Sequence, residues 1–141
     1  MSFERTRRVM RWGLAGLYGL AGIMHLHSPE AFVLIVPTWV PWPYHVVIVT
    51  GLFEIAGAIG LLTQRLRALA AIMLAVYAVA VFPANIKHAF DHVQVGGLPT
   101  SWWYHGPRFA LQPVLVWWAL FCGGVIDWPL RRYRRPTSVQ T

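Results

Sequence analysis

The chain has 141 residues, of which 57% are hydrophobic and 12% are charged, and its formal net charge is +7. This length suits one domain, and so large an apolar share is more than a soluble domain of this size can bury. A basic soluble domain would suggest nucleic acid as a partner. Here the basic residues are clustered between long apolar runs, which favours the lipid bilayer and no nucleic acid.

Four apolar runs are each long enough for a membrane-spanning helix, which needs about 20 residues. They cover residues 9–27, 44–62, 66–90 and 108–126. Basic residues precede the first run, as in a signal peptide, but three further runs follow it. We therefore interpret it as a retained first span. The sequence predicts an all-α protein, an integral membrane four-helix bundle in which residues 1–141 form a single transmembrane domain.

The basic residues indicate the orientation of these spans. Of the twelve, four precede the first span, two lie between the second and third, and four follow the fourth. Only Lys87 and Arg108 would lie on the other side. Because loops rich in lysine and arginine stay in the cytoplasm, we expect both termini to be cytoplasmic.

The first outer connection, residues 28–43, begins with a helix-start pattern. Ser28 is suited to the N-cap and Pro29 to the first helical position, and an apolar turn follows. The pattern predicts a short helix at the outer interface, between spans one and two. Aromatic residues of the outer loops are expected at headgroup level: Trp39, Trp42, Tyr44, Trp102, Trp103 and Tyr104. The histidines His27, His45 and His105 are interpreted as interfacial.

The first span carries a glycine repeat. Gly13, Gly16, Gly19 and Gly22 recur at every third residue. Small residues usually mark the packed faces of membrane helices, because lipid provides no hydrophobic force between them. This pattern predicts a glycine ridge that faces the bundle, or that pairs with a second copy of the chain.

Glu54 is the only charged residue of the second span, near the expected midplane of the bilayer. A charged carboxylate there costs about 2.5 to 3.5 kcal/mol on insertion scales, so Glu54 must be neutral, paired or hydrated. The other spans offer polar side chains at a comparable depth: Tyr18, His25, Tyr77, Asn85, His88 and Gln112. We expect a site in the outer half of the bundle, with Glu54 and His25 as the proton-exchanging pair and the other five as ligand-binding residues. Whether Glu54 contacts His25 directly is left open, as is a purely structural role for the carboxyl group.

The stretch FPANIKHAFDH, residues 82–92, should end the third span. Pro83 lacks an amide donor, so it is expected to kink the helix and to leave a carbonyl group one turn earlier without its usual partner. His88 and His92 have the spacing to share a metal ion, but no third ligand is fixed by spacing. We therefore predict no metal site. Cys122 is the only cysteine, which excludes an intramolecular disulfide.

Three segments, in this order along the chain, carry a resemblance to a known family: GIMHLHSPEAFVLIVP, GLFEIAGAIGLL and VFPANIKHAF. Through these segments, roughly residues 14–123 resemble the DoxX-like family of small bacterial membrane proteins. The resemblance implies a four-helix bundle in the bacterial cytoplasmic (inner) membrane, with His25, Glu54 and Asn85 at matching positions. Some members are associated with redox chemistry, which implies a membrane redox partner. This sequence departs from that family at Lys87 and His88 and in lacking paired cysteines, which speaks against a thiol-based role.

Three functions fit these observations. The first is a redox-associated accessory subunit that binds an apolar ligand, such as a quinone, in the outer half of the bundle. The second is a membrane enzyme of the isomerase or hydratase type, with Glu54 as general acid or base. The third is a structural partner or assembly factor. We expect the first.

Overall fold

The structure, a computed structural model, describes residues 3–91, 97, 99 and 101–129. Within these residues the chain is all-α, as predicted, with no strand. The helices are α1 (Phe3–His27), α2 (Pro29–Val33), α3 (Pro43–Leu62), α4 (Arg67–Ala80), α5 (Phe82–Phe90) and α6 (Trp102–Gly123).

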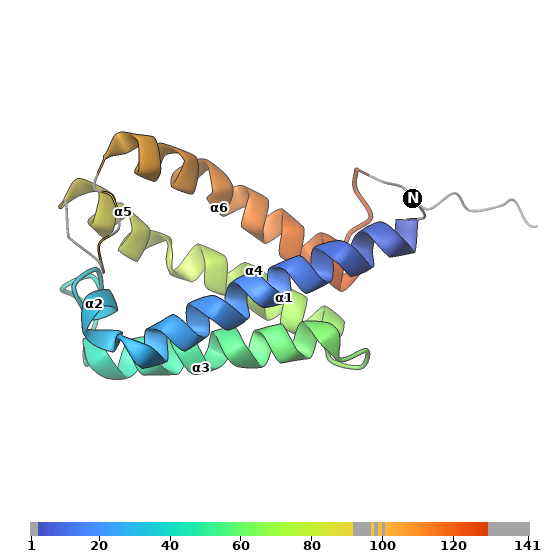
Figure 1. The fold of residues 1–141 in the computed structure, drawn as a ribbon, viewed down its shortest axis with the longest axis horizontal. Coiled ribbons are helices and arrows are strands. Elements are labelled where there is room, and N and C mark those ends of the chain that lie inside the picture. The colour runs from blue at the N-terminus through green and yellow to red at the C-terminus, as the bar shows by residue number, and fades with distance from the viewer. Residues whose placement is uncertain (1–2, 92–96, 98, 100, 130–141) are drawn as a thin grey trace, which may run out of the picture.

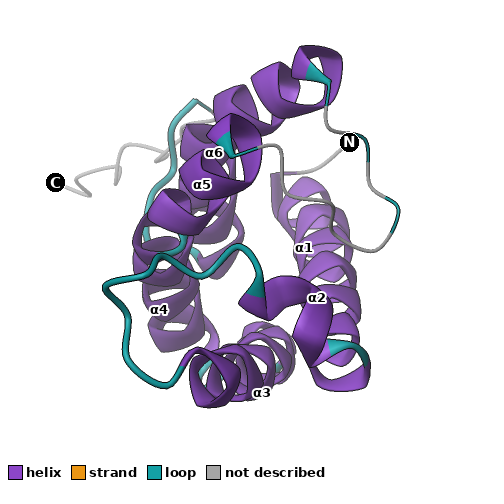
Figure 2. Ribbon diagram, turned by 90° about the vertical axis from the view of Figure 1, so that its left-hand side faces the viewer, coloured by secondary structure: helices purple, strands orange, loops and turns teal. Residues whose placement is uncertain are grey.

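The long helices lie side by side and alternate in direction (Figure 1). Helix α1 packs on α3, α3 on α4, α4 on α6, and α6 on α1. The start of α1, the turn between α3 and α4, and the end of α6 share one end of the molecule, here called the basic end. At the other end, here called the α2 end, the short helix α2 lies against α1 and α3 (Figure 2).

The third apolar run does not form one regular helix. It is interrupted at Val81, two residues before Pro83, so that α4 and α5 are separate helices. The expected kink is therefore present as a helix break, because the proline ring cannot follow the preceding turn of a regular helix. The fourth run differs at its start: α6 begins at Trp102 instead of residue 108, so the expected aromatic loop segment is helical.

Helices α1 and α3 approach most closely at two glycines. A Cβ added at Gly22 would lie 2.6 Å from the carbonyl oxygen of Gly51, and one added at Gly51 would lie 2.8 Å from the Cβ of His25. Only glycine leaves room for this approach. Three residues further along each helix stand His25 and Glu54, which are thereby brought side by side.

The predicted glycine ridge is only partly correct. Gly22 and Gly19 face α3, but a Cβ at Gly13 would meet Trp118 and one at Gly16 would have nothing within 4 Å. The reason is geometric, since each step of three residues drifts about 60° around a helix with 3.6 residues per turn. A three-residue repeat therefore winds around α1 and cannot stay on one face.

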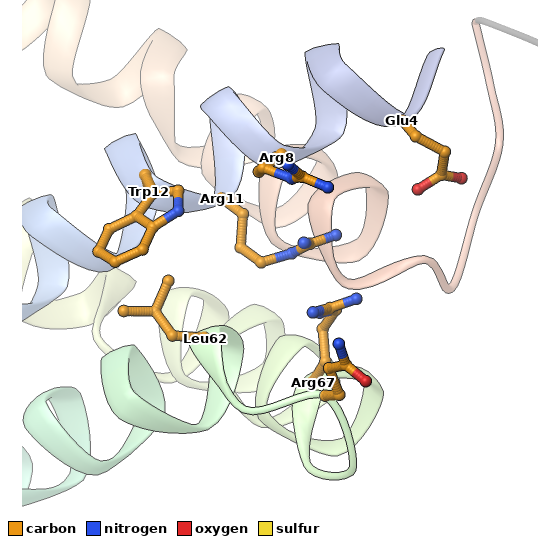
Figure 3. A pocket seen from close by; sticks show the side chains of 7 residues that line it. Glu4, Arg8, Arg11, Trp12, Leu62 and Arg67 are labelled. Carbon is orange, nitrogen blue, oxygen red and sulfur yellow. The ribbon is translucent and has the colours of Figure 1, made fainter. Parts of the chain in front are cut away.

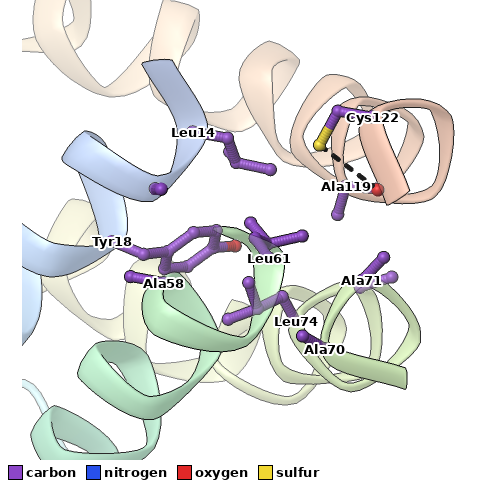
Figure 4. Packing of buried hydrophobic residues seen from close by; sticks show 11 residues of the cluster. Leu14, Tyr18, Ala58, Leu61, Ala70, Ala71, Leu74, Ala119 and Cys122 are labelled. Atoms are coloured by element: carbon purple, nitrogen blue, oxygen red, sulfur yellow. Dashed lines mark hydrogen bonds between the residues drawn. The ribbon is translucent and has the colours of Figure 1, made fainter. Parts of the chain in front are cut away.

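The hydrophobic core lies between the four long helices (Figure 4). Small and aliphatic side chains from the four long helices meet there: Leu14, Ala15, Tyr18, Ala58, Leu61, Ala70, Ala71, Leu74, Ala75, Ala119 and Cys122. The Cys122 thiol is fully buried and donates a hydrogen bond to the Ala119 carbonyl at 3.5 Å. Closer to the α2 end, the buried side chains include the polar residues Glu54, His88, His105 and Gln112.

Within the described residues, two helical segments are long and apolar enough to cross a membrane. They are Pro43–Leu62 and the α4–α5 segment Arg67–Phe90. By the same measure of length and composition α1 and α6 fall short, because arginine, histidine and proline dilute their apolar residues.

Candidate functional site

Glu54 lies between α1 and α4 and is only 4% exposed. The Tyr77 hydroxyl donates a hydrogen bond to its Oε1 at 2.9 Å. On the other side, Nδ1 of His25 lies 3.0 Å from Oε2. The same Nδ1 lies 2.8 Å from the Ala21 carbonyl, which can only accept, so Nδ1 carries a proton that points to Ala21. Oε2 is therefore buried without a well-aligned hydrogen bond.

Aromatic rings enclose this group. Phe32 of α2 stacks on the His25 ring, with centroids 4.0 Å apart. Around Tyr77, Tyr18 packs edge-on at 6.2 Å and Phe53 packs at 5.5 Å. The carboxyl group is thus surrounded by apolar surface on several sides, where each remaining polar contact is stronger than in water.

A second polar cluster lies closer to the α2 end, between α5 and α6. Asn85 donates from Nδ2 to Oε1 of Gln112 at 3.1 Å. Arg108 donates from Nη2 to Oδ1 of Asn85 at 2.7 Å and from Nη1 to Nδ1 of the fully buried His88 at 2.5 Å. Because arginine can only donate, Nδ1 of His88 is an acceptor and its ring is neutral in this arrangement.

The helix break at Val81 links the two clusters. The amide group of Gln112 donates to the carbonyl oxygen of Ala78, in the last turn of α4 before the break. The carbonyl group that loses its usual donor at Pro83 is that of Val79, four residues earlier, so Gln112 bonds to the carbonyl group next to it. Tyr77 contacts Glu54 while its neighbour Ala78 contacts Gln112, so one turn of α4 carries a contact to each cluster.

The Arg108 guanidinium is half-buried, and no carboxylate lies within 4.0 Å of it among the residues that the structure describes. An arginine has five N–H donors, and within the described part of the chain Asn85 and His88 occupy two of those of Arg108. The remaining donors and the uncompensated charge suit a carbonyl or anionic oxygen of a ligand.

The structure separates the predicted site residues into two groups. Glu54 contacts His25 and Tyr77, with Tyr18 beside them, whereas Asn85 contacts Gln112 and Arg108 instead of Glu54. His88 lies in the second group, and the ring of His105 lies 4.8 Å from it. The ligand-binding roles of these residues stay predictions.

Two residues of the second cluster escaped the sequence analysis. From the sequence, Arg108 indicates only the membrane orientation and His105 is predicted to be interfacial. In the structure, however, His105 is only 1% exposed. Their spacing contained a signal: residues 105, 108 and 112 share one face of a helix. The sequence predicts a helix only from residue 108, so the shared face becomes apparent only because α6 starts at Trp102.

In the part of the chain that the structure describes, no three side chains of histidine, cysteine, aspartate or glutamate lie close enough together to hold a metal ion. His92, the proposed partner of His88, lies outside the described residues. The cavities of about 270 and 200 Å³ lie at the basic end, away from both polar clusters.

A family comparison covers both polar clusters. The model of a protein family described as a domain of unknown function (DUF8561) matches residues 14–123. The chain belongs to the DUF8561 family. The matched segment ends where α6 ends and leaves out the first turns of α1, with their arginines. Comparisons of this DUF8561 chain with curated proteins and with solved structures find no match. The resemblance to DoxX-like proteins stays a prediction.

Proposed function

We propose that the chain is a multi-pass protein of the bacterial cytoplasmic membrane, in which α1, α3, the α4–α5 segment and α6 cross the bilayer as a four-helix bundle. The supporting observation is aliphatic surface that is exposed on every long helix. It includes Leu17, Leu20, Ile23, Val49, Leu52, Ile59, Ile72, Val76, Val79, Leu111 and Val114. Soluble proteins rarely expose so much apolar surface, whereas lipid covers it at no cost.

The proposed orientation puts the basic end in the cytoplasm. Arginines at the start of α1 and the start of α4 support it. At the α2 end, exposed tryptophans fit the outer headgroup level, with Trp39 at 74%, Trp42 at 76% and Trp103 at 91% exposure. Helix α2 would then be the short interfacial helix.

Cysteine labelling in intact spheroplasts tests this orientation. Thr38 and Gln64 are exposed in the α2–α3 connection and the α3–α4 turn, and the native Cys122 is fully buried. A membrane-impermeant maleimide should label Thr38→Cys from outside and Gln64→Cys only after permeabilisation. The reverse pattern would overturn the orientation.

For the site, we propose a redox-associated accessory role of the DoxX-like kind, with a quinone as the apolar ligand. The observation that carries it is that the protein contains two suitable groups. One is the buried carboxyl group of Glu54, which contacts Tyr77 and His25, and the other is Arg108, which has no carboxylate partner among the described residues. Glu54 and His25 would exchange the proton, and a membrane redox partner would supply the electrons. Tyr18 and Tyr77 would border the ring.

Arg108 is the strongest candidate to hold a quinone oxygen. The amide groups of Asn85 and Gln112 already donate to other groups in the protein. A ligand would have to break these bonds, whereas only two of the five Arg108 donors have a partner among the residues that the structure describes. Asn85 and His88 would then orient the guanidinium group toward the ligand.

Quinone binding to the purified chain in nanodiscs tests this role. We expect decylubiquinone to quench tryptophan fluorescence in a saturable way, and both Arg108→Gln and Glu54→Gln to weaken this binding. Arg5→Gln, an exposed change at the opposite end, is the control. A chain that neither retains quinone on purification nor binds it would refute the proposal.

An isomerase or hydratase is the second candidate, favoured by one observation. Oε2 of Glu54 is buried without a well-aligned hydrogen bond, so it could take a proton from a substrate. A turnover of lipophilic substrates that is lost in Glu54→Gln, without any quinone binding, would favour this enzyme. Loss of a co-purifying protein in the same variant would instead favour an assembly factor.

A further inference from the structure

A basic cavity of about 270 Å³ lies at the end opposite to Glu54, between α1 and the α3–α4 turn (Figure 3). It is lined by Glu4, Arg8, Arg11, Trp12, Leu62, Gln64 and Arg67. A neighbouring cavity of about 200 Å³ shares Glu4, Arg11 and Arg67 with it and reaches the end of α6. Because they share these residues, we interpret the two cavities as connected parts of one depression.

The charge of the larger cavity is unbalanced. Three guanidinium groups and one carboxyl group line it, which leaves a net charge of +2. No carboxylate lies within 4.0 Å of Arg8, Arg11 or Arg67 in the described part of the chain. Arg67 and Arg11 are close enough for their charges to repel. An anion between them would relieve this repulsion.

Two of the arginines are held in place by main-chain carbonyl groups. Arg11 donates from Nε to Cys122 at 3.0 Å, and Arg67 donates from Nε to Leu61 at 3.4 Å. These bonds use the inner nitrogen of each side chain, and the outer amino groups point toward one another (Figure 3). Arginines fixed in this way suit phosphate, whose oxygens accept two parallel hydrogen bonds from one guanidinium group.

The rim of the cavity is apolar on one side. Trp12 is 63% exposed and Leu62 is 36% exposed, and both continue the aliphatic surface of α1 and α3. A ligand with a phosphate group and acyl chains would find a partner for each part. Basic pockets on the cytoplasmic side of membrane helices are suited to such headgroups.

We propose that Arg8, Arg11 and Arg67 form a binding site for a phosphate group. Its source is either the headgroup of an anionic phospholipid, with acyl chains along Trp12 and Leu62, or a soluble phosphate compound. The site is separate from the proposed quinone site and does not depend on it. All four of its lining residues on α1 precede the segment matched by the family model.

Native mass spectrometry of the full chain tests the site. The protein would be released from nanodiscs of equal parts phosphatidylglycerol and phosphatidylcholine. We expect retained phosphatidylglycerol to exceed phosphatidylcholine, and the double variant Arg8→Gln/Arg67→Gln to reduce this preference about tenfold or more. The matched control, Arg5→Gln/Arg65→Gln, removes the same charge from two exposed positions outside the cavity and should retain the preference.

A second arm identifies the source of the phosphate. In nanodiscs of phosphatidylcholine alone, pyrophosphate would be titrated while the melting temperature is followed. Stabilisation by pyrophosphate that requires Arg8 and Arg67, without lipid preference, assigns the site to a soluble phosphate compound. The proposal is overturned if wild type shows neither effect, or if both double variants lose the effect equally, which would indicate general surface charge. Melting curves of both variants show whether they are folded.

Discussion

The Tyr77 hydroxyl donates a hydrogen bond to Oε1 of Glu54 at 2.9 Å and so connects α4 to α3 inside the protein. With His25 on the other oxygen, one carboxyl group contacts two neighbouring helices. A group that is costly to place in a membrane is thereby used to hold three helices in register.

Removal of the Tyr77 hydroxyl tests this connection. Tyr77→Phe keeps the ring and its packing but leaves Oε1 without its donor, so we expect a loss of about 1 kcal/mol in the free energy of unfolding. Unfolding in detergent micelles by added SDS, followed by circular dichroism, would measure it. Tyr18→Phe is the control, because the described structure shows no hydrogen bond from the Tyr18 hydroxyl. Equal losses in both variants would contradict the role of Tyr77.

The glycine crossing of α1 and α3 predicts a sharp contrast between two alanine substitutions. Gly22→Ala would place a Cβ 2.6 Å from the Gly51 carbonyl oxygen and push the helices apart, with an expected loss of about 1 to 3 kcal/mol. Gly16→Ala has open space and improves helix propensity, so it should be neutral or stabilising. The same unfolding assay compares them. A tolerated Gly22→Ala would mean that the helices are not in close contact.

We expect the hydrogen bonds of the Gln112 amide group to contribute more to stability than the size of the side chain does. Gln112→Leu leaves the Ala78 carbonyl and the Asn85 amide without their partner, and we expect a loss of about 1 to 3 kcal/mol. Gln64→Leu, at an exposed position in the α3–α4 turn, should change stability by less than about 0.5 kcal/mol. If both substitutions have similar effects in thermal unfolding, the hydrogen bonds of the Gln112 amide group do not stabilise the fold.

Arg7 should be the most important arginine of the basic end for stability. It is 3% exposed and donates to Phe121 in the last turn of α6 and to Ile126 and Asp127 just after that helix. We expect Arg7→Gln to cost about 3 kcal/mol, because buried carbonyl groups and a charge lose their partner.

Two comparisons isolate the cause of that loss. Asp127→Asn should cost less than about 1 kcal/mol, because the Asp127 side chain is 48% exposed. The exposed Arg5→Gln should be nearly neutral. A loss in Arg5→Gln as large as that in Arg7→Gln, measured by the same thermal unfolding, would point to net charge instead of the contacts of Arg7.

The sequence predicted the helical class and the bounds of the second apolar run almost to the residue, since residues 44–62 became Pro43–Leu62. It also predicted a disruption of the third run, because proline imposes its own backbone rule. These features are local. Composition and periodicity within one run are enough to infer them.

The contacts between helices could not be predicted in the same way. Whether His25 reaches Glu54 depends on how closely α1 and α3 cross, and this follows from two glycines that lie on different runs. Arg108 was overlooked because an arginine near the end of a span is usually drawn toward water. Only the packing of α5 on α6 reveals that it points inward to His88 and Asn85.

The arginines of α1 that reach the end of α6 impose an order on synthesis. Arg7 and Arg11 are synthesised well before the carbonyl groups that they bind, which belong to residues more than 110 positions later. Until the last helix has been inserted, these two side chains must remain hydrated or contact lipid phosphates. The nascent protein therefore closes its ring of helices only after the end of α6 has been made, and a chain truncated before Phe121 would never close it.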